Sequence, residues 1–244
     1  MKYYDMHEDA YKQLKDKKKI SWDGETDTKK LFEHESNIAI EDKLFDFIKE
    51  PEGKSAVDLG TGTGTCALNL ARLGFRVKGY DLSPTAISMA KENAKNLGFN
   101  IDFKVADITT IESEEKAQLV VDSSLLHCLV AKEDRTNFFK LAYNLLTDDG
   151  YLFLHTMLET EDMSIMTDRN HLFYEDHILY STGPDRWDME WQDIQGHRVF
   201  PHRWMTTIPM LEEEIAKAGF KMIYYNTKAE KGSSGVLHGW LQKA

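Results

Sequence analysis

The sequence predicts an α/β protein with a seven-stranded, mostly parallel, doubly wound sheet and helices on both of its faces. Three observations support this fold class. Short apolar runs alternate with helix-like stretches from Ser36 to Met157, which is the pattern of β–α–β units. A glycine-rich turn follows the first apolar run. The last two strand-like runs flank a short loop, so we expect them to pair antiparallel.

The elements follow one another in a regular order. Ser83 before Pro84 is a favoured helix start, and Gly98 is a favoured helix end. Thr207 before Ile208 indicates another helix start. The expected strands are residues 56–59, 76–81, 101–106, 118–122, 151–156, 221–226 and 236–241. The expected helices are residues 36–50, 65–73 and 84–97, one beginning near 123, one around 138–145, and 208–218.

Two segments interrupt this alternation. Residues 1–35 are polar with scattered aromatic side chains, so we expect an N-terminal lid arm outside the core. Residues 158–206 follow the fifth strand and are rich in aromatic, histidine and acidic residues. Within this insertion, the strand-like stretches 187–193 and 197–204 could form a hairpin.

Composition limits the classes of partner. The formal net charge is −11, which disfavours nucleic acid and anionic membranes because both need a positive field. No apolar run is long enough to span a bilayer. The N-terminus is polar and unlike a signal peptide, so we expect a cytoplasmic protein with no membrane partner. The two cysteines, Cys66 and Cys128, are expected to be packed thiols.

The stretch AVDLGTGTGTC at residues 56–66 leaves three interpretations of the glycine turn. A phosphate-binding loop needs a lysine after its last glycine, and none is present. A dinucleotide turn needs the spacing G-x-G-x-x-G, but here the third glycine comes one residue early. Asp58, two residues before the first glycine, would repel a pyrophosphate and suit a cation. A turn without any ligand is the remaining alternative.

A second acid marks the end of the next strand. Asp81 lies 23 residues after Asp58, where a carboxylate can accept hydrogen bonds from both hydroxyls of a ribose. The alternative is an aspartate that caps the following helix. Ser83 is already available as that cap, so the ribose role is favoured.

The string DLGTGTG from Asp58 to Gly64 resembles the cofactor turn of class I S-adenosylmethionine-dependent methyltransferases. That cofactor carries an ammonium and a sulfonium, which suits a carboxylate beside the glycines. The resemblance covers residues 36–157 and 220–242 and implies a nucleoside site at the ends of the second and third strands. The cofactor-binding residues implied are Asp58, Gly60, Gly62, Gly64, Asp81, Leu82, Asp107, Ile108 and Asp122.

The chemistry is expected at the end of the fourth strand, in VVDSSLLHCL at residues 120–129. This stretch resembles small-molecule members of the class, with Asp122 facing the methionine end of the cofactor. His127 is the candidate general base, because its ordinary pKa lies near neutrality. The alternative is a histidine bonded to backbone, and many enzymes of the class act by proximity alone.

Candidate substrate residues lie in the two segments outside the core. Trp22, in SWDGE at residues 21–25, resembles a stretch found in thiol- and halide-type methyltransferases. Trp191 and Trp204 offer aromatic faces for cations or planar rings, although packing is the alternative. Arg203 could pair with a substrate carboxylate or form a surface ion pair. The spacing of histidines and acids in the insertion fits no metal template, so no metal ligand is assigned, and a metal site there stays an open alternative.

The resemblance therefore implies an enzyme that uses S-adenosyl-L-methionine to methylate nitrogen, oxygen or sulfur of a small molecule by in-line displacement. A regulatory cofactor-binding protein and a nucleic-acid or protein methyltransferase are the alternatives. We expect one domain over residues 1–244, as a monomer or homodimer. Its parts are a lid arm (1–35), a cofactor-binding core (36–157), a substrate-covering insertion (158–206) and a closing helix with two antiparallel strands (207–244).

Overall fold

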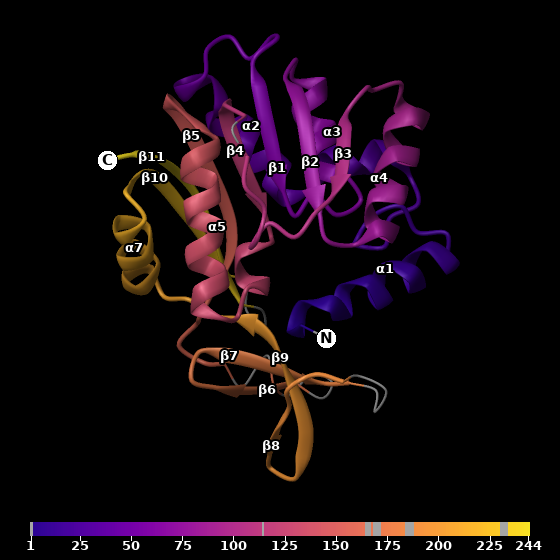
Figure 1. Cartoon of the computed structure of the whole chain (residues 1–244), viewed down its shortest axis with the longest axis vertical. Coiled ribbons are helices and arrows are strands. Elements are labelled where there is room, and N and C mark those ends of the chain that lie inside the picture. Colours follow the sequence, from indigo (N-terminus) through magenta and orange to yellow (C-terminus); the bar gives the residue numbers. More distant parts are fainter. Residues whose placement is uncertain (1, 114, 164–166, 168–171, 184–187, 230–233) are drawn as a thin grey trace.

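The main sheet has seven strands in the order β10-β11-β5-β4-β1-β2-β3 (Figure 1). The computed structural model describes residues 2–113, 115–163, 167, 172–183, 188–229 and 234–244. The first five strands pair in parallel, whereas β11 is antiparallel to both β5 and β10. The predicted fold class is therefore confirmed. The strands are β1 Ser55–Leu59, β2 Arg76–Asp81, β3 Asp102–Val105, β4 Ala117–Ser123, β5 Leu146–Leu158, β10 Phe220–Ala229 and β11 Gly235–Lys243.

Helices cover both faces of this sheet. Alternate residues of each strand point to opposite faces, so each strand contributes to both layers of the core. Val120 packs in the cluster that contains α5 and α7, and its neighbour Val121 packs in the cluster that contains α2, α3 and α4. The helices are α1 Met6–Asp16, α2 Glu35–Phe47, α3 Thr65–Arg72, α4 Pro84–Leu97, α5 Lys132–Leu145 and α7 Ile208–Lys217. Short 3-10 helices are η1 Tyr3–Asp5, η2 Thr28–Glu33 and η3 Leu126–Cys128. None of these described helices is long and apolar enough to cross a membrane.

The capping signals in the sequence act as expected. The Ser83 side chain accepts a hydrogen bond from the Ala86 amide, 2.9 Å away, at the start of α4. Gly98 ends that helix with a left-handed φ of 76°. Thr207 caps α7 in the same way as Ser83 caps α4. These local bonds explain why the ends of both helices could be predicted.

One predicted helix is wrong. The helix expected from residue 123 is only the single 3-10 turn η3, and α5 begins later, at Lys132. The Asp122 carboxylate accepts hydrogen bonds from the amides of Leu125 (2.6 Å) and Leu126 (3.2 Å). Ser124 has a left-handed φ of 81°, which is incompatible with a continuous helix. The acid at the strand end therefore folds the chain into a tight turn.

The arm lies closer to the core than its polarity predicts. Its aromatic side chains Tyr4 and Tyr11 are 7% and 8% exposed, and Leu31 is 1% exposed. Tyr4 and Leu31 belong to the two main clusters of buried apolar residues. The expectation that the arm lies outside the core was wrong for these residues, because each buries a large apolar surface against the sheet and its helices.

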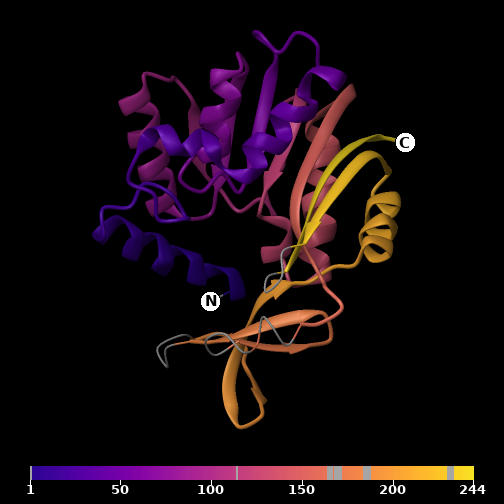
Figure 2. The same cartoon turned by 180° about the vertical axis from the view of Figure 1, so that it is seen from behind.

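The insertion forms a second, four-stranded antiparallel sheet in the order β6-β7-β9-β8. Its strands are β6 Leu172–Glu175, β7 Ile178–Thr182, β8 Gln192–Ile194 and β9 His197–Trp204. The predicted hairpin is confirmed between β8 and β9, although residue 187 lies outside the described residues. Figure 2 shows this sheet and α1 at the same end of the main sheet. Both segments are therefore close to the carboxyl ends of the parallel strands.

Candidate active site

Two cavities lie side by side where the parallel strands end. The first has a volume of about 420 Å³ and is lined by α1 and by the segments that follow β1, β2, β3 and β4. The second, about 430 Å³, is lined by the glycine turn, the arm, the turn after β4 and Arg203 of β9. His7, Tyr11, Gly60, Ser124 and Cys128 border both cavities. Each volume is in the range of pockets that bind small molecules.

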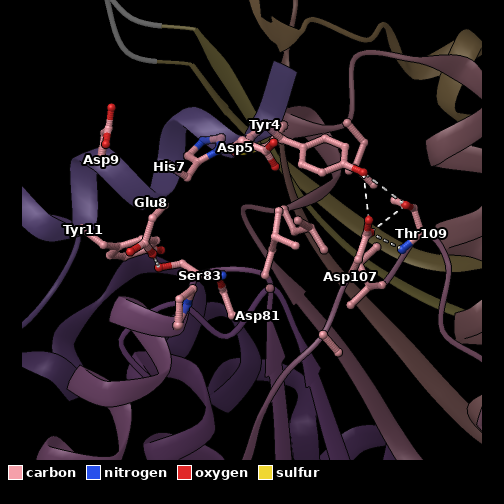
Figure 3. Close-up of a pocket in the computed structure, with 18 of the residues that line it drawn as sticks. Tyr4, Asp5, His7, Glu8, Asp9, Tyr11, Asp81, Ser83, Asp107 and Thr109 are labelled. Atoms are coloured by element: carbon pink, nitrogen blue, oxygen red, sulfur yellow. Dashed lines mark hydrogen bonds between the residues drawn. The ribbon is translucent and has the colours of Figure 1, made fainter. Parts of the chain in front are cut away.

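Asp81 borders the first cavity (Figure 3), and both of its carboxylate oxygens accept hydrogen bonds. Its Oδ2 accepts from the Gly62 amide at 2.8 Å, and its Oδ1 accepts from the Ser83 amide at 2.9 Å. Burial raises the pKa of Asp81 to about 6. Each oxygen keeps further acceptor capacity, so the carboxylate can still accept hydrogen bonds from a ligand in the cavity.

Asp107 borders the opposite side of the first cavity and is already hydrogen-bonded (Figure 3). It accepts from Lys2 Nζ (2.8 Å), from the Tyr4 hydroxyl (3.1 Å), and from the Thr109 amide (3.0 Å) and hydroxyl (2.7 Å). Partial burial alone would raise its pKa, but these hydrogen bonds outweigh burial and lower it. Two of the donors, Lys2 and Tyr4, come from the arm, so hydrogen bonds join the arm to the wall of the cavity.

The glycine turn separates Asp58 from solvent. Asp58 is fully buried, and its Oδ2 accepts from the Thr61 hydroxyl (2.6 Å) and the Ala67 amide (3.1 Å). Its Oδ1 is buried without a hydrogen-bond partner among the described residues. Burial raises the pKa of Asp58 to about 7. Because Asp58 borders the second cavity, this free oxygen is a suitable acceptor for a cationic ligand.

The middle glycine of the turn is required by close packing. Gly62 has a left-handed φ of 54°, and a Cβ at this position would stand 2.7 Å from the Tyr11 hydroxyl. Tyr11 belongs to α1, so the arm helix reaches directly over the glycine turn. The turn therefore contacts the arm on one side and both cavities on the other.

His127 borders the second cavity and is 6% exposed. Its Nδ1 accepts a hydrogen bond from the Met157 amide at 3.3 Å. Burial, together with the nearby Arg203 guanidinium, lowers the pKa of His127 well below its ordinary value, so the ring is neutral. A nitrogen that accepts carries no proton, and the proton of the ring is therefore on Nε2.

Arg203 is a buried cation on the wall of the second cavity, with 8% of its surface exposed. Its Nη1 donates to the His202 carbonyl (2.8 Å) and lies 3.2 Å from His7 Nε2. His7 Nδ1 lies 2.8 Å from the Tyr4 carbonyl, so Nδ1 donates and Nε2 can accept from Arg203. No ion pair joins Arg203 to a carboxylate of the described residues. A buried guanidinium without an anion is costly.

The structure gathers most of the site residues named from the sequence. Asp81, Leu82, Asp107 and Ile108 border the first cavity, Gly60 borders both, and Asp58, Gly62, Trp22, His127 and Arg203 border the second. Gly64 caps α3 directly after the turn.

Besides Gly64, three named residues border neither cavity. Asp122 is fully buried and caps the turn after β4, and burial raises its pKa to about 8. Trp204 follows Arg203 on β9 and therefore points to the other face, where its ring centroid lies 4.1 Å from Arg135 Cζ. Trp191 is 54% exposed and contacts Arg198. The suggested roles of these three residues stay predictions.

Sequence reasoning missed the contribution of η1 and α1 to the site. Tyr4, His7, Glu8 and Tyr11 all border the first cavity. Glu8 accepts from the hydroxyls of Ser83 and Thr85 at the start of α4. The signal was present, because positions 4, 7, 8 and 11 have the spacing of one helix face.

Comparison with known proteins gives the family. The methyltransferase domain family matches residues 50–198, which is more than half of the chain. A ubiquinone biosynthesis O-methyltransferase of Xanthomonas axonopodis pv. citri is 28% identical over 111 residues, 46% of each chain. A ribosomal-protein methyltransferase of Dictyoglomus thermophilum is 36% identical over 89 residues, 36% of this chain and 29% of its own. The chain thus spans about half or less of the length of these relatives.

Solved structures show the same fold. An S-adenosylmethionine-dependent methyltransferase of Clostridium acetobutylicum aligns with a TM-score of 0.62 at 17% identity, over 89% of this chain and 92% of its own. The magnesium protoporphyrin IX methyltransferase of Synechocystis, with bound S-adenosylhomocysteine, aligns with a TM-score of 0.61 at 14% identity, over 85% and 82%. The chain belongs to the methyltransferase domain family. Within it, the motifs and strand order place the chain among the class I S-adenosylmethionine-dependent methyltransferases.

Proposed function

We propose that this protein transfers a methyl group from S-adenosylmethionine to a small molecule that carries an anionic group, such as a carboxylate. The observation that carries the proposal is the buried Arg203 guanidinium. It borders the same cavity as the glycine turn and His127 and has no ion pair with a described carboxylate. An anionic substrate would supply the missing counter-charge.

The donors and acceptors of the site fit the cofactor. We assign the ribose to Asp81, the adenine amino group to Asp107, and the two faces of the adenine to Leu82 and Ile108, all of which border the first cavity. Asp107 can receive the adenine only if Lys2 or Tyr4 gives up its hydrogen bond, so the arm would have to shift when the cofactor enters.

The methionine half of the cofactor is assigned to the glycine turn and Asp58, with Asp122 supporting that end. The free Oδ1 of Asp58 suits the cofactor ammonium, and Gly60 and Gly62 border the second cavity, where a missing Cβ lets backbone approach a ligand closely. The bound cofactor would supply a methyl group activated by its sulfonium. The chain aligns the acceptor behind that group and excludes water. We infer that the arm and the insertion cover the site.

A small acceptor fits this site better than a macromolecule. The second cavity is of small-molecule size and is bordered by side chains of the arm and the insertion. The net charge of −11 opposes nucleic acid. The ribosomal-protein methyltransferase among the relatives makes a protein substrate the second candidate. A regulatory protein that only binds the cofactor is the third.

The release of S-adenosylhomocysteine with a panel of amines, thiols, phenols and carboxylic acids tests the function. We expect turnover with acids and at least about tenfold lower kcat/KM with their neutral esters. Arg203→Met should raise the KM for the acid at least about tenfold and leave the Kd of S-adenosylhomocysteine unchanged. Arg198→Met, on the same strand β9, is the matched control.

The outcomes separate the candidates. Binding of the cofactor without turnover on any small or protein substrate would favour the regulatory protein. A rise in the Kd of S-adenosylhomocysteine in Arg203→Met, equal to the rise in KM, would assign Arg203 to the cofactor carboxylate and remove the argument for an anionic acceptor.

His127 is proposed to act as a hydrogen-bond donor through Nε2, because its Nδ1 already accepts from Met157. His127→Ala should lower kcat/KM by about tenfold, the scale of one lost hydrogen bond to a buried group, and leave the Kd of S-adenosylhomocysteine unchanged. The pH profiles of wild type and variant should have the same shape. A limb of unit slope in wild type that disappears in His127→Ala would instead make His127 the general base.

A further inference from the structure

Three residues far apart in the sequence meet beside the second cavity. Glu35 is the first residue of α2, His155 lies in β5, and His238 lies in β11. The antiparallel register of β5 and β11 places the two histidines opposite each other, with ring centroids 4.8 Å apart. Both point to the sheet face that α2 covers, because His155 alternates in phase with Phe153, which packs there. One ligand atom from each of the three lies within 4.8 Å of the others.

Both histidines carry a buried nitrogen that nothing in the described chain satisfies. His155 is 7% exposed and His238 is 8% exposed. His155 Nδ1 and His238 Nε2 have no hydrogen-bond partner among the described residues. Unsatisfied buried polar groups are rare and call for an explanation such as an ion or a water. Two such nitrogens in facing rings point to one shared ligand.

A ring nitrogen of a neutral histidine that carries no proton holds the lone pair that metal binding requires. His34, the neighbouring histidine, is engaged elsewhere: its Nδ1 lies 2.7 Å from the Ser36 hydroxyl and its Nε2 lies 3.3 Å from Asp23.

The third residue supplies a carboxylate. Glu35 is half-buried and its Oε1 lies 3.3 Å from Lys228 Nζ, which leaves Oε2 without an ion pair in the described residues. Two imidazoles and one carboxylate form a common donor set for catalytic zinc, with a fourth position left open. Glu35 and His155 both border the second cavity, so an open position would face it.

We propose that Glu35, His155 and His238 bind a divalent transition-metal ion of the zinc class. Tetrahedral bonds of about 2.0–2.1 Å need ligand atoms roughly 3.4 Å apart. The present separations of up to 4.8 Å would therefore have to close by up to about 1.4 Å when the ion binds. The spacing of these residues in the sequence did not predict a metal site, because the three residues come from separate elements. The ion would bind whether or not the acceptor is anionic.

Metal binding to the purified chain, stripped with a chelator, tests the proposal. Competition with a chromophoric chelator should give one Zn²⁺ per chain. Co²⁺ in place of Zn²⁺ should give visible absorption bands of a low-symmetry site. His155→Ala and His238→Ala should each weaken Zn²⁺ binding by more than about 100-fold, because even losing a supporting partner costs 10–100-fold. Glu35→Gln should weaken it less.

The control is His197→Ala, which removes an exposed histidine of β9 and should bind Zn²⁺ as wild type does. His155→Gln and His238→Gln keep the volume of the site if the alanine variants do not fold. Wild type without stoichiometric Zn²⁺, or His155 and His238 variants with wild-type affinity, would overturn the proposal and assign the two nitrogens to a bridging water. Neither outcome depends on turnover, so the proposed function is tested separately.

Discussion

Asp81→Ala is expected to weaken the binding of S-adenosylhomocysteine by about 1.5–3 kcal/mol, roughly 10- to 150-fold in Kd. Asp81 is the acceptor assigned to the ribose hydroxyls, and hydrogen bonds to a charged group exceed those between neutral groups. The alanine side chain would leave the hydroxyls, and also the amides of Gly62 and Ser83, without their acceptor. Isothermal titration calorimetry measures the change.

Two further variants separate binding from folding. Asp81→Asn keeps an acceptor for one of the two amides but removes the charge, so it should show an intermediate loss. Asp149→Ala removes an exposed aspartate near the start of β5, at the end of the parallel strands opposite to the cavities, and should bind as wild type does. Wild-type affinity in Asp81→Ala would exclude Asp81 from the ribose site.

The second large effect is a pH dependence of cofactor binding that comes from Asp58. Burial raises the pKa of Asp58 to about 7, so the empty site is mostly protonated at pH 6. The cofactor ammonium needs the ionised form, and binding therefore releases a proton. The affinity for S-adenosylhomocysteine should rise with pH through the pKa of the free site, by about eightfold between pH 6 and pH 7.5.

The raised pKa of Asp58 also predicts that the chain without cofactor becomes less stable as pH rises, whereas its affinity for the cofactor increases. A carboxyl group with a raised folded-state pKa binds more protons when folded than when unfolded. Its contribution is largest at low pH and is lost as pH rises from the unfolded value of 3.8 towards about 7. Asp81 and Asp122 change stability in the same direction.

Asp58→Asn tests whether Asp58 is the titrating group. The amide is nearly isosteric and can still accept from Thr61, but it does not ionise in this range. The variant should bind S-adenosylhomocysteine more weakly, with a nearly flat profile over the same pH interval. A profile of wild-type steepness in Asp58→Asn would show that another group, such as Asp81, causes the pH dependence.

The strands, the helix caps and the acids at the carboxyl ends of the strands could be predicted, because each depends on residues close together in the sequence. Ser83 and Thr207 cap helices through bonds within three residues. The acids at 58, 81 and 107 lie at or just after the carboxyl ends of parallel strands, so they meet at one end of the sheet. The helix expected after β4 failed because the capping role of Asp122 depends on how the turn folds, which residue spacing does not reveal.

The acceptor side was harder to predict, because its parts come together only through tertiary packing. Arg203 and Trp204 are adjacent in the sequence, yet the pleat of β9 sends only Arg203 to the cavity. The role of the arm depends on contacts such as those of Lys2 and Tyr4 with Asp107, more than 100 residues away.

The fold class and the glycine turn with its acids could be predicted, because these features depend on periodicity and on residues close together in the chain. The tertiary structure decided which distant side chains share a cavity. It buried Arg203 without a carboxylate among the described residues, bonded His127 to the Met157 amide, and brought Glu35, His155 and His238 together. The reason is physical: burial and long-range contact set the charge and partners of a group, and neither is encoded in local spacing.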